Sequence, residues 1–186
     1  MSKALIVVDM QKDFCDGGAL GIDGGYKLAD EIAFYLSIAS PNLTVVATTD
    51  WHIDPGEHFS DNPDYADTWP PHCIAGTAGA ELAPIIADYP FDAVFSKGQY
   101  DAAYSGFEGK TARGVSLEEF LRDRDVKEVY VVGLAFDYCV AATARDAAKA
   151  GFHTTIFSNL TLPVHPGERD VRDMEEALRA DGVFIL

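Results

Sequence analysis

Short apolar runs recur along the chain, and longer segments with apolar residues at helical spacing separate them. Six such runs predict β-strands, at residues 4–8, 43–48, 93–95, 129–132, 154–157 and 183–186. The runs are almost continuously hydrophobic, which is typical of strands in a parallel sheet that is covered on both faces. Helices are predicted between them, at residues 26–39, 116–124, 137–150 and 168–180.

The ends of two predicted helices carry recognisable signals. Ser116 followed by Glu119 has the form of a capping box, and Gly151 stands where the preceding helix should stop. Strands and helices alternate throughout, and no repeat or linker divides the chain. We therefore expect an α/β fold in one domain over residues 1–186, built as a three-layer sandwich with helices on both faces of a parallel sheet.

One long segment, at about residues 50–90, interrupts this alternation. It holds six of the nine prolines, both tryptophans and three of the five histidines. Loops much longer than about 15 residues are uncommon in compact domains and are usually functional or disordered. Because disordered segments rarely have this aromatic content, we expect an ordered functional loop inserted into the fold.

Charge and cysteine content narrow the classes of function. The chain has 14 Lys and Arg against 30 Asp and Glu, which gives a formal net charge of −16. Such an acidic surface repels nucleic acid and anionic membranes, so neither is expected as a partner. No apolar stretch resembles a signal peptide or a membrane-spanning helix, and three cysteines make no disulfide framework. These features together predict a cytoplasmic protein.

Residues with useful chemistry stand where four of the predicted strands end. Asp9, Asp50 and Lys97 follow the first three strands, and Cys139 follows the fourth after a short turn. The carboxyl ends of parallel strands meet at one edge of a sheet, where ligands bind in such folds. Polar residues are common at sheet edges, but that explanation accounts poorly for all four residues together.

Cys139 is the candidate nucleophile. A lone cysteine is most often a small buried hydrophobic residue, and we expect that role for Cys15 and Cys73. Cys139 differs because a helix start and a nearby lysine both lower the pKa of a thiol. Asp9 would then act as the general base, and Lys97 would hold the ion pair.

The long loop also carries a candidate metal site. Imidazole and carboxylate ligands suit zinc, iron or manganese, and metal binding would explain how the loop is ordered. The spacing alone matches no common zinc signature, and isolated surface histidines are the alternative. His153 and His165 lie elsewhere in the sequence and are expected to be structural or surface residues. The candidate ligands are Asp50, His52, His58 and His72.

Aromatic residues flank these positions and would wall a flat substrate, although aromatic side chains more often fill cores. They are Phe14, Trp69, Tyr104 and Phe107. The glycine-bearing residues 104–109 match no phosphate-binding fingerprint, so nucleotide binding is not expected.

Five segments, taken in order, resemble the motifs of one known family. They are VVDMQKDFCDGG at 7–18, DWHIDPGEHFS at 50–60, WPPHCIAGTAGAEL at 69–82, FSKGQYDAAYSGFEG at 95–109 and VVGLAFDYCVAATARDA at 131–147. This is the nicotinamidase, or pyrazinamidase, family of the isochorismatase-like cysteine hydrolase superfamily. The resemblance runs from Lys3 to the last predicted strand, and five motifs in register make it highly specific.

The resemblance implies a six-stranded parallel sheet and a thiol-dependent amidohydrolase. The implied catalytic triad is Asp9, Lys97 and Cys139. The implied ligands of one divalent metal are Asp50, His52, His58 and His72. In the family the metal takes up the pyridine nitrogen of nicotinamide, and the reaction proceeds through a cysteine thioester to nicotinate and ammonia. The resemblance further implies a role in NAD salvage, pyrazinamide as a second substrate, and a monomer or small homo-oligomer.

Substrate contacts are implied as well. Phe14 and Trp69 match the positions that sandwich the ring, and Tyr104 is expected to contact the substrate. Leu134 and Ala135 match the site of a cis peptide bond that also borders the substrate. The backbone N–H groups of Ala135 and Cys139 match the oxyanion hole of the family.

Two positions depart from the family pattern, and three alternatives stay open. Phe136 is bulkier than the small polar residue often found there, and Tyr138 occupies a variable position, so both put the pocket volume in question. A related amidohydrolase acting on carbamoyl or ureido compounds would generally lack the metal loop. Isochorismate hydrolysis would leave Cys139 without a role. A catalytically silent scaffold would be expected to have lost part of the triad.

Overall fold

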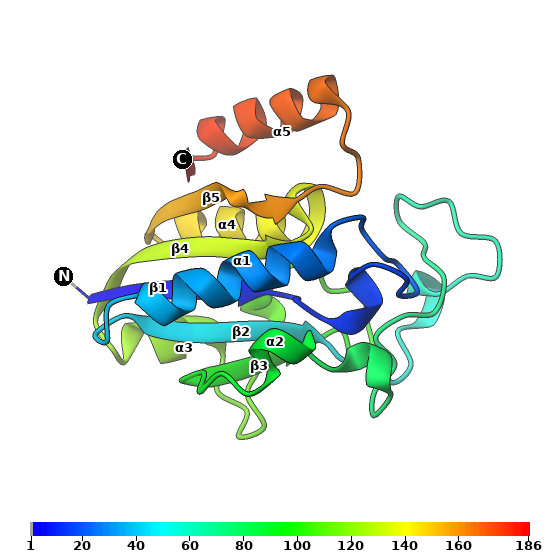
Figure 1. Ribbon diagram of the computed structural model, residues 1–186, viewed down its shortest axis with the longest axis horizontal. Helices are drawn as coiled ribbons and strands as arrows, with labels where there is room; N and C mark the ends of the chain where they lie inside the picture. Colours follow the sequence, from blue (N-terminus) through cyan, green and yellow to red (C-terminus); the bar gives the residue numbers. More distant parts are fainter. Residues whose placement is uncertain (1) are drawn as a thin grey trace.

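Six strands form one parallel sheet in the computed structural model, which describes residues 2–186 (Figure 1). The strand order is β3-β2-β1-β4-β5-β6, so the chain winds outward from β1 in both directions. The predicted strands and the α/β class are confirmed, and the strands extend beyond the predicted runs chiefly in β4 and β5. Their bounds are β1 Ser2–Val8, β2 Thr44–Asp50, β3 Ala93–Lys97, β4 Val126–Leu134, β5 His153–Leu162 and β6 Phe184–Ile185.

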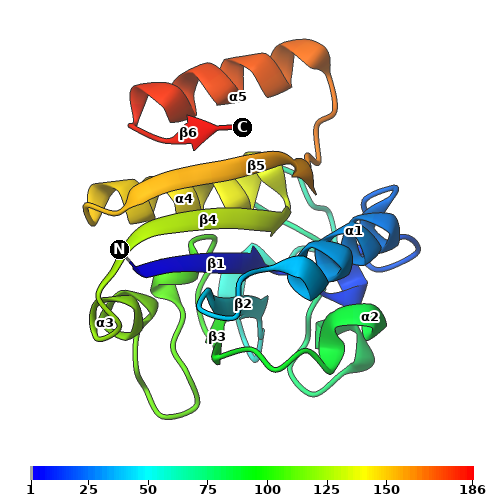
Figure 2. The same cartoon turned by 60° about the vertical axis from the view of Figure 1, so that its left-hand side comes forward.

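Helices cover both faces of this sheet and complete the three layers. Figures 1 and 2 show α1 on one side of the strands and α4 on the other. The helices on the first side are α1 (Gly25–Ile38) and α2 (Pro84–Ala87), and those on the second are α3 (Leu117–Arg122), α4 (Ala141–Lys149) and α5 (Glu168–Ala180). The short helix α2 was not predicted, because four residues are too few to establish a helical period.

The sheet is hydrophobic on both faces because both faces are buried. Along β1, Ala4, Ile6 and Val8 point into the core beneath α3 and α4, whereas Leu5 and Val7 point into the core beneath α1. All five side chains are fully buried. This arrangement explains the unbroken apolar run in the sequence, since alternate residues serve different layers.

The helix predicted at residues 137–150 begins with a different geometry. Its first turn, Phe136–Val140, is π-helical, and the N–H of Val140 donates to the carbonyl of Ala135 at 3.0 Å. The peptide bond between Leu134 and Ala135 just before it is cis, as the family resemblance implies. This turn carries Cys139 at the carboxyl end of β4, and π-helical turns occur frequently at functional sites.

The carboxyl ends of β1 and β4 approach each other closely at the point where the strand order reverses. Gly133 adopts a φ of +113°, and a Cβ at this position would lie 2.1 Å from the carbonyl oxygen of Val8. Only glycine allows this contact, which brings Asp9 and the Cys139 turn to the same edge. Ligands bind at such switch points in open α/β sheets.

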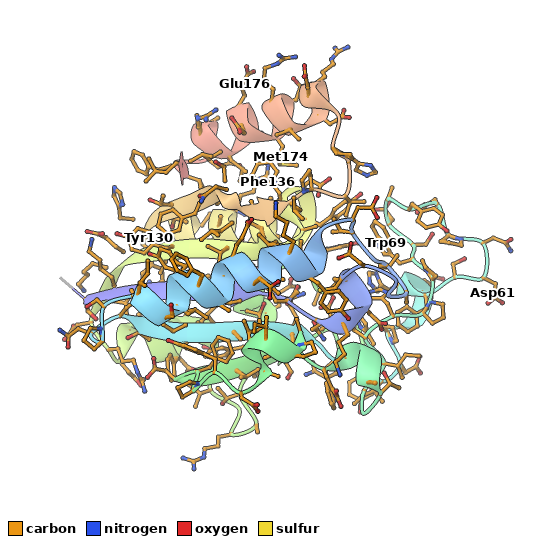
Figure 3. The ribbon with its side chains drawn as sticks, in the orientation of Figure 1. Asp61, Trp69, Tyr130, Phe136, Met174 and Glu176 are labelled. Carbon is orange, nitrogen blue, oxygen red and sulfur yellow. The ribbon has the colours of Figure 1, made fainter. Side chains whose placement is uncertain are left out.

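Backbone hydrogen bonds hold the loop between β2 and β3 together and join it to the sheet edge. The N–H of His52 donates to Cys73 at 3.0 Å, that of Trp69 to His58 at 2.9 Å, and that of Ala83 to Met10 at 2.7 Å. Figure 3 shows Asp61 at the outer tip of the loop and Trp69 where the loop returns to the sheet. Within residues 2–186, no helix has both the length and the apolar character needed to cross a membrane.

Candidate active site and metal centre

Lys97, the last residue of β3, lies at the centre of a buried polar cluster. Its Nζ is 2.9 Å from Asp9 Oδ2, 2.5 Å from Asp50 Oδ1 and 3.6 Å from Cys139 Sγ. It also donates to the carbonyl of Ala103 at 3.0 Å. The other two strand-end residues and the thiol that the sequence singled out therefore all surround the ammonium group of Lys97.

Asp9 presents one of its two carboxylate oxygens to this cluster. Oδ1 accepts a hydrogen bond of 2.6 Å from the hydroxyl of Thr48. Oδ2 lies close to Lys97 but accepts no well-aligned hydrogen bond from the part of the chain that the structure describes, so the contact is an ion pair and Oδ2 can still accept a proton. The backbone of Asp9 has a φ of +46°, an uncommon conformation for a residue other than glycine.

The two carboxylates beside Lys97 have different proton affinities. Burial raises the pKa of Asp9, and the nearby charge of Asp50 adds to this, so that the opposing effect of Lys97 is outweighed. Burial also acts to raise the pKa of Asp50, but Lys97 and His52 together hold it below its ordinary value. The pKa of Lys97 lies well above normal, because its two carboxylates outweigh its burial. Asp50 is thus the permanent anion, and Asp9 is the group suited to exchanging a proton.

The expectation of a lowered thiol pKa at Cys139 is wrong. Burial raises the pKa of Cys139 well above its ordinary value, and the carboxylates of Asp9 and Asp50 oppose the lowering effect of Lys97. The resting group is therefore a neutral thiol, and it needs a base to become a nucleophile. Cys15 and Cys73 are also buried, and burial raises the pKa of each thiol.

Three histidines converge beside Asp50. One nitrogen from each of His52, His58 and His72 lies within 4.8 Å of the others. Asp50 Oδ2 is 3.8 Å from His52 Nε2 and 4.0 Å from His72 Nε2. The four residues predicted as metal ligands therefore come together, although they span 23 positions of the sequence.

Backbone carbonyls orient two of these rings. His52 Nδ1 lies 2.6 Å from the oxygen of Gly98, and His72 Nδ1 lies 2.8 Å from the oxygen of Pro70. A carbonyl can only accept, so each Nδ1 carries a hydrogen, which leaves Nε2 as the nitrogen with the lone pair in the neutral ring. Gly98 is essential to this approach, because a Cβ there would lie 2.6 Å from the ring of His52.

The donor set fits a divalent transition metal. His52 Nε2 and His58 Nδ1 are buried without a hydrogen-bond partner among the described residues, which is costly unless something else occupies them. Burial, with help from His72 and His52, lowers the pKa of His58 to about 4, and burial lowers the pKa of His72 as well. Both rings are therefore neutral near pH 7, the state in which imidazole binds metals.

Gln11 supports this centre and was missed by sequence reasoning. Its side-chain amide accepts from the N–H of Asp50 and donates to the carbonyl of Asp50, each at 2.8 Å. It also donates to the carbonyl of Ala80 at 2.8 Å. A single buried side chain thus fixes the backbone of a candidate ligand and anchors the long loop, a contact for which the sequence carries no signal.

A cavity of about 620 Å³ opens onto both clusters. Asp9, Lys97 and His52 lie behind its wall. The predicted residues that line it are Phe14, Asp50, His58, Trp69, His72, Tyr104, Leu134, Ala135 and Cys139. Lining residues that the sequence did not suggest come from 18–23 and 162–164, together with Tyr65, Ala103 and Pro166.

The aromatic candidates divide between the cavity and the core. Trp69 Nε1 donates to the hydroxyl of Tyr104 at 3.1 Å, and the ring of Phe14 lies 5.5 Å from that of His72. Phe107 is not part of the cavity wall and packs near Phe152, with ring centroids 6.2 Å apart.

The two residues that depart from the family pattern, Phe136 and Tyr138, lie in different places. Phe136 is buried in the core beneath α4, so the expectation that it reduces the pocket is wrong. Tyr138 does line the cavity, and its hydroxyl contacts His165 Nε2 at 3.2 Å and the carbonyl of Tyr65 at 3.4 Å. His165 is exposed, as is His153, which stacks on Phe184 away from the cavity.

Comparisons with known proteins agree with this geometry. Residues 3–179 match the family model described as "Isochorismatase domain". The chain is 51% identical over 162 residues to the nicotinamidase/pyrazinamidase of Mycobacterium tuberculosis, and the match covers 87% of each protein. The pyrazinamidase of Pyrococcus horikoshii in complex with zinc superposes with a TM-score of 0.83 at 37% identity, covering 100% of this chain and 99% of that one. PnC1 from L. infantum in complex with nicotinate gives a TM-score of 0.83 at 35% identity, with 100% and 92% covered.

Proposed function

Because this chain belongs to the isochorismatase family and is an amidohydrolase of the nicotinamidase type, we propose that it hydrolyses nicotinamide to nicotinate and ammonia. The main support is that the thiol cluster and the histidine cluster share the carboxylate of Asp50 and open into one cavity. Neither cluster alone would distinguish this reaction from other hydrolyses. Together they provide a nucleophile for a carboxamide and a site for a ring nitrogen.

In the first half of the reaction, Cys139 attacks the amide carbon and Asp9 accepts the thiol proton. The C–S bond forms as the carbonyl π electrons move to oxygen. Asp9 then gives the proton to the amide nitrogen, the C–N bond breaks, and ammonia leaves a nicotinoyl thioester on Cys139. The raised pKa of Asp9 suits this role, because the group must both accept and release a proton near neutral pH.

The negative oxygen of the intermediate needs donors that are already in place. The N–H groups of Ala135 and Cys139 belong to the cis peptide and the π-helical turn that follow β4. In the proposal these two groups form the oxyanion hole, and removing one such donor from an enzyme typically costs about 10²- to 10³-fold in kcat.

In the second half, water hydrolyses the thioester. Asp9 takes a proton from the water as its oxygen bonds to the acyl carbon, and the proton then returns to the sulfur as the C–S bond breaks. Lys97 stays protonated throughout, since two carboxylates stabilise its charge. It therefore serves as a fixed countercharge that also lies near the sulfur.

Asp50, His52, His58 and His72 would hold the metal in this proposal. When bound, a divalent transition metal supplies a Lewis-acidic site for the ring nitrogen of the substrate. Phe14 and Trp69 would contact the two faces of the ring. The choice among zinc, iron and manganese stays a prediction, as does hydrolysis of pyrazinamide.

The wider setting is likewise proposed. A nicotinamide deamidase supplies nicotinate to NAD salvage, and three free cysteines suit a reducing cytoplasm. We propose that the whole chain acts as one domain, with residues 50–90 as its metal-binding loop, and that it works as a monomer or small homo-oligomer.

A panel of amides tests the proposal. The purified protein, loaded separately with zinc, iron or manganese, is assayed for ammonia release from nicotinamide, pyrazinamide, benzamide and an N-carbamoyl amino acid. Nicotinamide should be hydrolysed far faster than benzamide, which has the same shape but no ring nitrogen. Equal rates for these two amides, or release only from the N-carbamoyl compound, would contradict the proposed function.

A further inference from the structure

We propose that Thr48 is a positioning residue for the proton transfers, because its hydroxyl occupies Oδ1 of Asp9 and confines the exchanged proton to Oδ2. The inference rests on the proposed function, since it assigns a direction to the same general base. Thr48 lies on β2, two residues before Asp50, and is fully buried.

Three contacts join Thr48 to Asp9. The hydroxyl donates to Asp9 Oδ1 at 2.6 Å. The N–H of Asp9 donates to the backbone oxygen of Thr48 at 3.1 Å and also approaches its hydroxyl oxygen at 3.3 Å. The hydroxyl therefore has its single hydrogen committed to the carboxylate, while its oxygen faces the N–H of the same residue. Rotation of the carboxylate would break the strongest of these contacts.

The rotamer of Thr48 is itself constrained by its surroundings. Its methyl group packs against Gly106, where a Cβ would lie 2.7 Å away. A β-branched side chain has few χ1 states, and contact on the methyl side leaves the hydroxyl directed at Asp9. The N–H of Gly106 is held by the hydroxyl of Thr143 at 2.8 Å, so this packing surface is also fixed.

Because the Thr48 hydroxyl occupies Oδ1, only Oδ2 of Asp9 remains available to accept a proton. Within residues 2–186, Oδ2 of Asp9 accepts no hydrogen bond, and it lies beside Lys97, whose Nζ is 3.6 Å from Cys139 Sγ. The proton that leaves the thiol therefore arrives on Oδ2, and it leaves from the same oxygen for the departing nitrogen. Without the Thr48 hydroxyl, either oxygen could hold the proton, and one of them faces away from the reaction.

Matched substitutions separate this role from a merely structural one. Thr48→Val keeps the shape and removes the hydroxyl, whereas Thr48→Ser keeps the hydroxyl. Thr49→Val is the control, because the Thr49 hydroxyl contacts Ser96 at 3.2 Å rather than Asp9. Thr48→Val should lower kcat for nicotinamide by about 10- to 100-fold with little change in KM, the size expected for a hydrogen bond to a charged group.

The pH profile gives a second readout. A hydrogen bond to the ionised carboxylate lowers its pKa, so its loss in Thr48→Val should move the acid limb of kcat/KM to higher pH. Thr48→Ser should keep kcat and the acid limb of kcat/KM close to those of the wild type, and Thr49→Val should leave both unchanged. An unaltered rate and profile in Thr48→Val, or an equal loss in Thr48→Ser, would overturn the proposal.

A substrate-free measurement keeps this inference separable from the proposed function. The rate of Cys139 alkylation by iodoacetamide, followed on its peptide, reports how readily the thiol loses its proton. Thr48→Val should alkylate at a different rate from Thr49→Val at the same metal content and pH, because only Thr48→Val changes the proton affinity of Asp9. If the wild-type protein released no ammonia from any amide but this difference held, the proposed function would fail and the role of Thr48 would stand. Equal alkylation rates would count against Thr48 whatever the substrate.

Discussion

The carboxylate of Asp50 lies 2.5 Å from the ammonium of Lys97 through one oxygen and faces two histidine nitrogens through the other. The same side chain is thus part of the thiol cluster and of the candidate metal centre. A substitution of Asp50 should therefore alter both the thiol cluster and the candidate metal centre. The prediction for Asp50→Asn therefore concerns two properties at once.

Asp50→Asn should impair metal binding and stability together. The substitution removes a charged ligand and leaves Lys97 with one carboxylate fewer in a fully buried place. Breaking a buried ion pair costs about 3–5 kcal/mol, and we expect a loss in the free energy of unfolding near the lower figure because Asp9 remains. Urea denaturation and metal content of the purified protein measure the two effects. Asp61→Asn, at the tip of the same loop, is the control, and full metal content in Asp50→Asn would remove Asp50 from the ligand set.

Gly98→Ala should weaken metal binding without altering any candidate ligand. The new Cβ would meet the ring of His52 at 2.6 Å, and the φ of +72° is itself unfavourable for alanine. Gly114 has a similar φ of +82° with open space around it, so Gly114→Ala carries the strain but not the clash. Zinc titration should show at least about 10-fold weaker binding for Gly98→Ala only, the effect typical of disturbing a ligand's support. Equal affinities in the two variants would show that His52 does not need this approach.

The metal-free protein should lose stability as the pH falls from about 6.5 toward 4. Burial lowers the pKa of His58 from 6.5 to about 4, so between these values the unfolded chain binds a proton that the folded protein does not. Unfolding is then favoured by acid, and stability rises with pH across this window. Thermal melting in the presence of a chelator measures the trend, and His58→Asn should flatten it. A steeper slope in His58→Asn would contradict the assignment.

Tyr138→Phe should loosen the mouth of the cavity. The substitution removes the hydroxyl contacts to Tyr65 and His165, which tie two cavity-lining loops together, and it keeps the ring. The ratio of kcat/KM for a ring-methylated nicotinamide to that for nicotinamide should rise by about 2- to 10-fold, the range expected for losing one or two ordinary hydrogen bonds. Tyr100→Phe, on an exposed tyrosine outside the cavity, should leave the ratio unchanged. An unchanged ratio in Tyr138→Phe would mean that these contacts do not limit the accepted ring.

The edge where the site lies could be predicted from the sequence because parallel strands end together. Asp9, Asp50 and Lys97 each stand at or just beyond the end of a strand, so their meeting follows from the strand direction alone. The histidines could be grouped because they share one loop with Asp50. In both cases a pattern in the local sequence predicts that residues far apart in the chain lie close together in the fold.

Other features depend on packing that no local pattern reports. The thiol pKa at Cys139 was predicted with the wrong sign, because burial and two carboxylates outweigh the lysine. Phe136 was expected at the pocket, but the turn that places Cys139 directs it into the core. Gln11 and Thr48 act through partners 39 positions away, at contacts that only the folded sheet creates.

The most direct test is ammonia release from nicotinamide by Cys139→Ala and by the wild-type protein at equal metal content. If Cys139 is the nucleophile, the wild-type protein should release ammonia and the variant should be slower by at least about 10⁴-fold, as removal of a catalytic nucleophile typically causes. The metal content and melting temperature of the variant should stay close to those of the wild type. Ammonia release by Cys139→Ala at the wild-type rate would contradict the thiol mechanism.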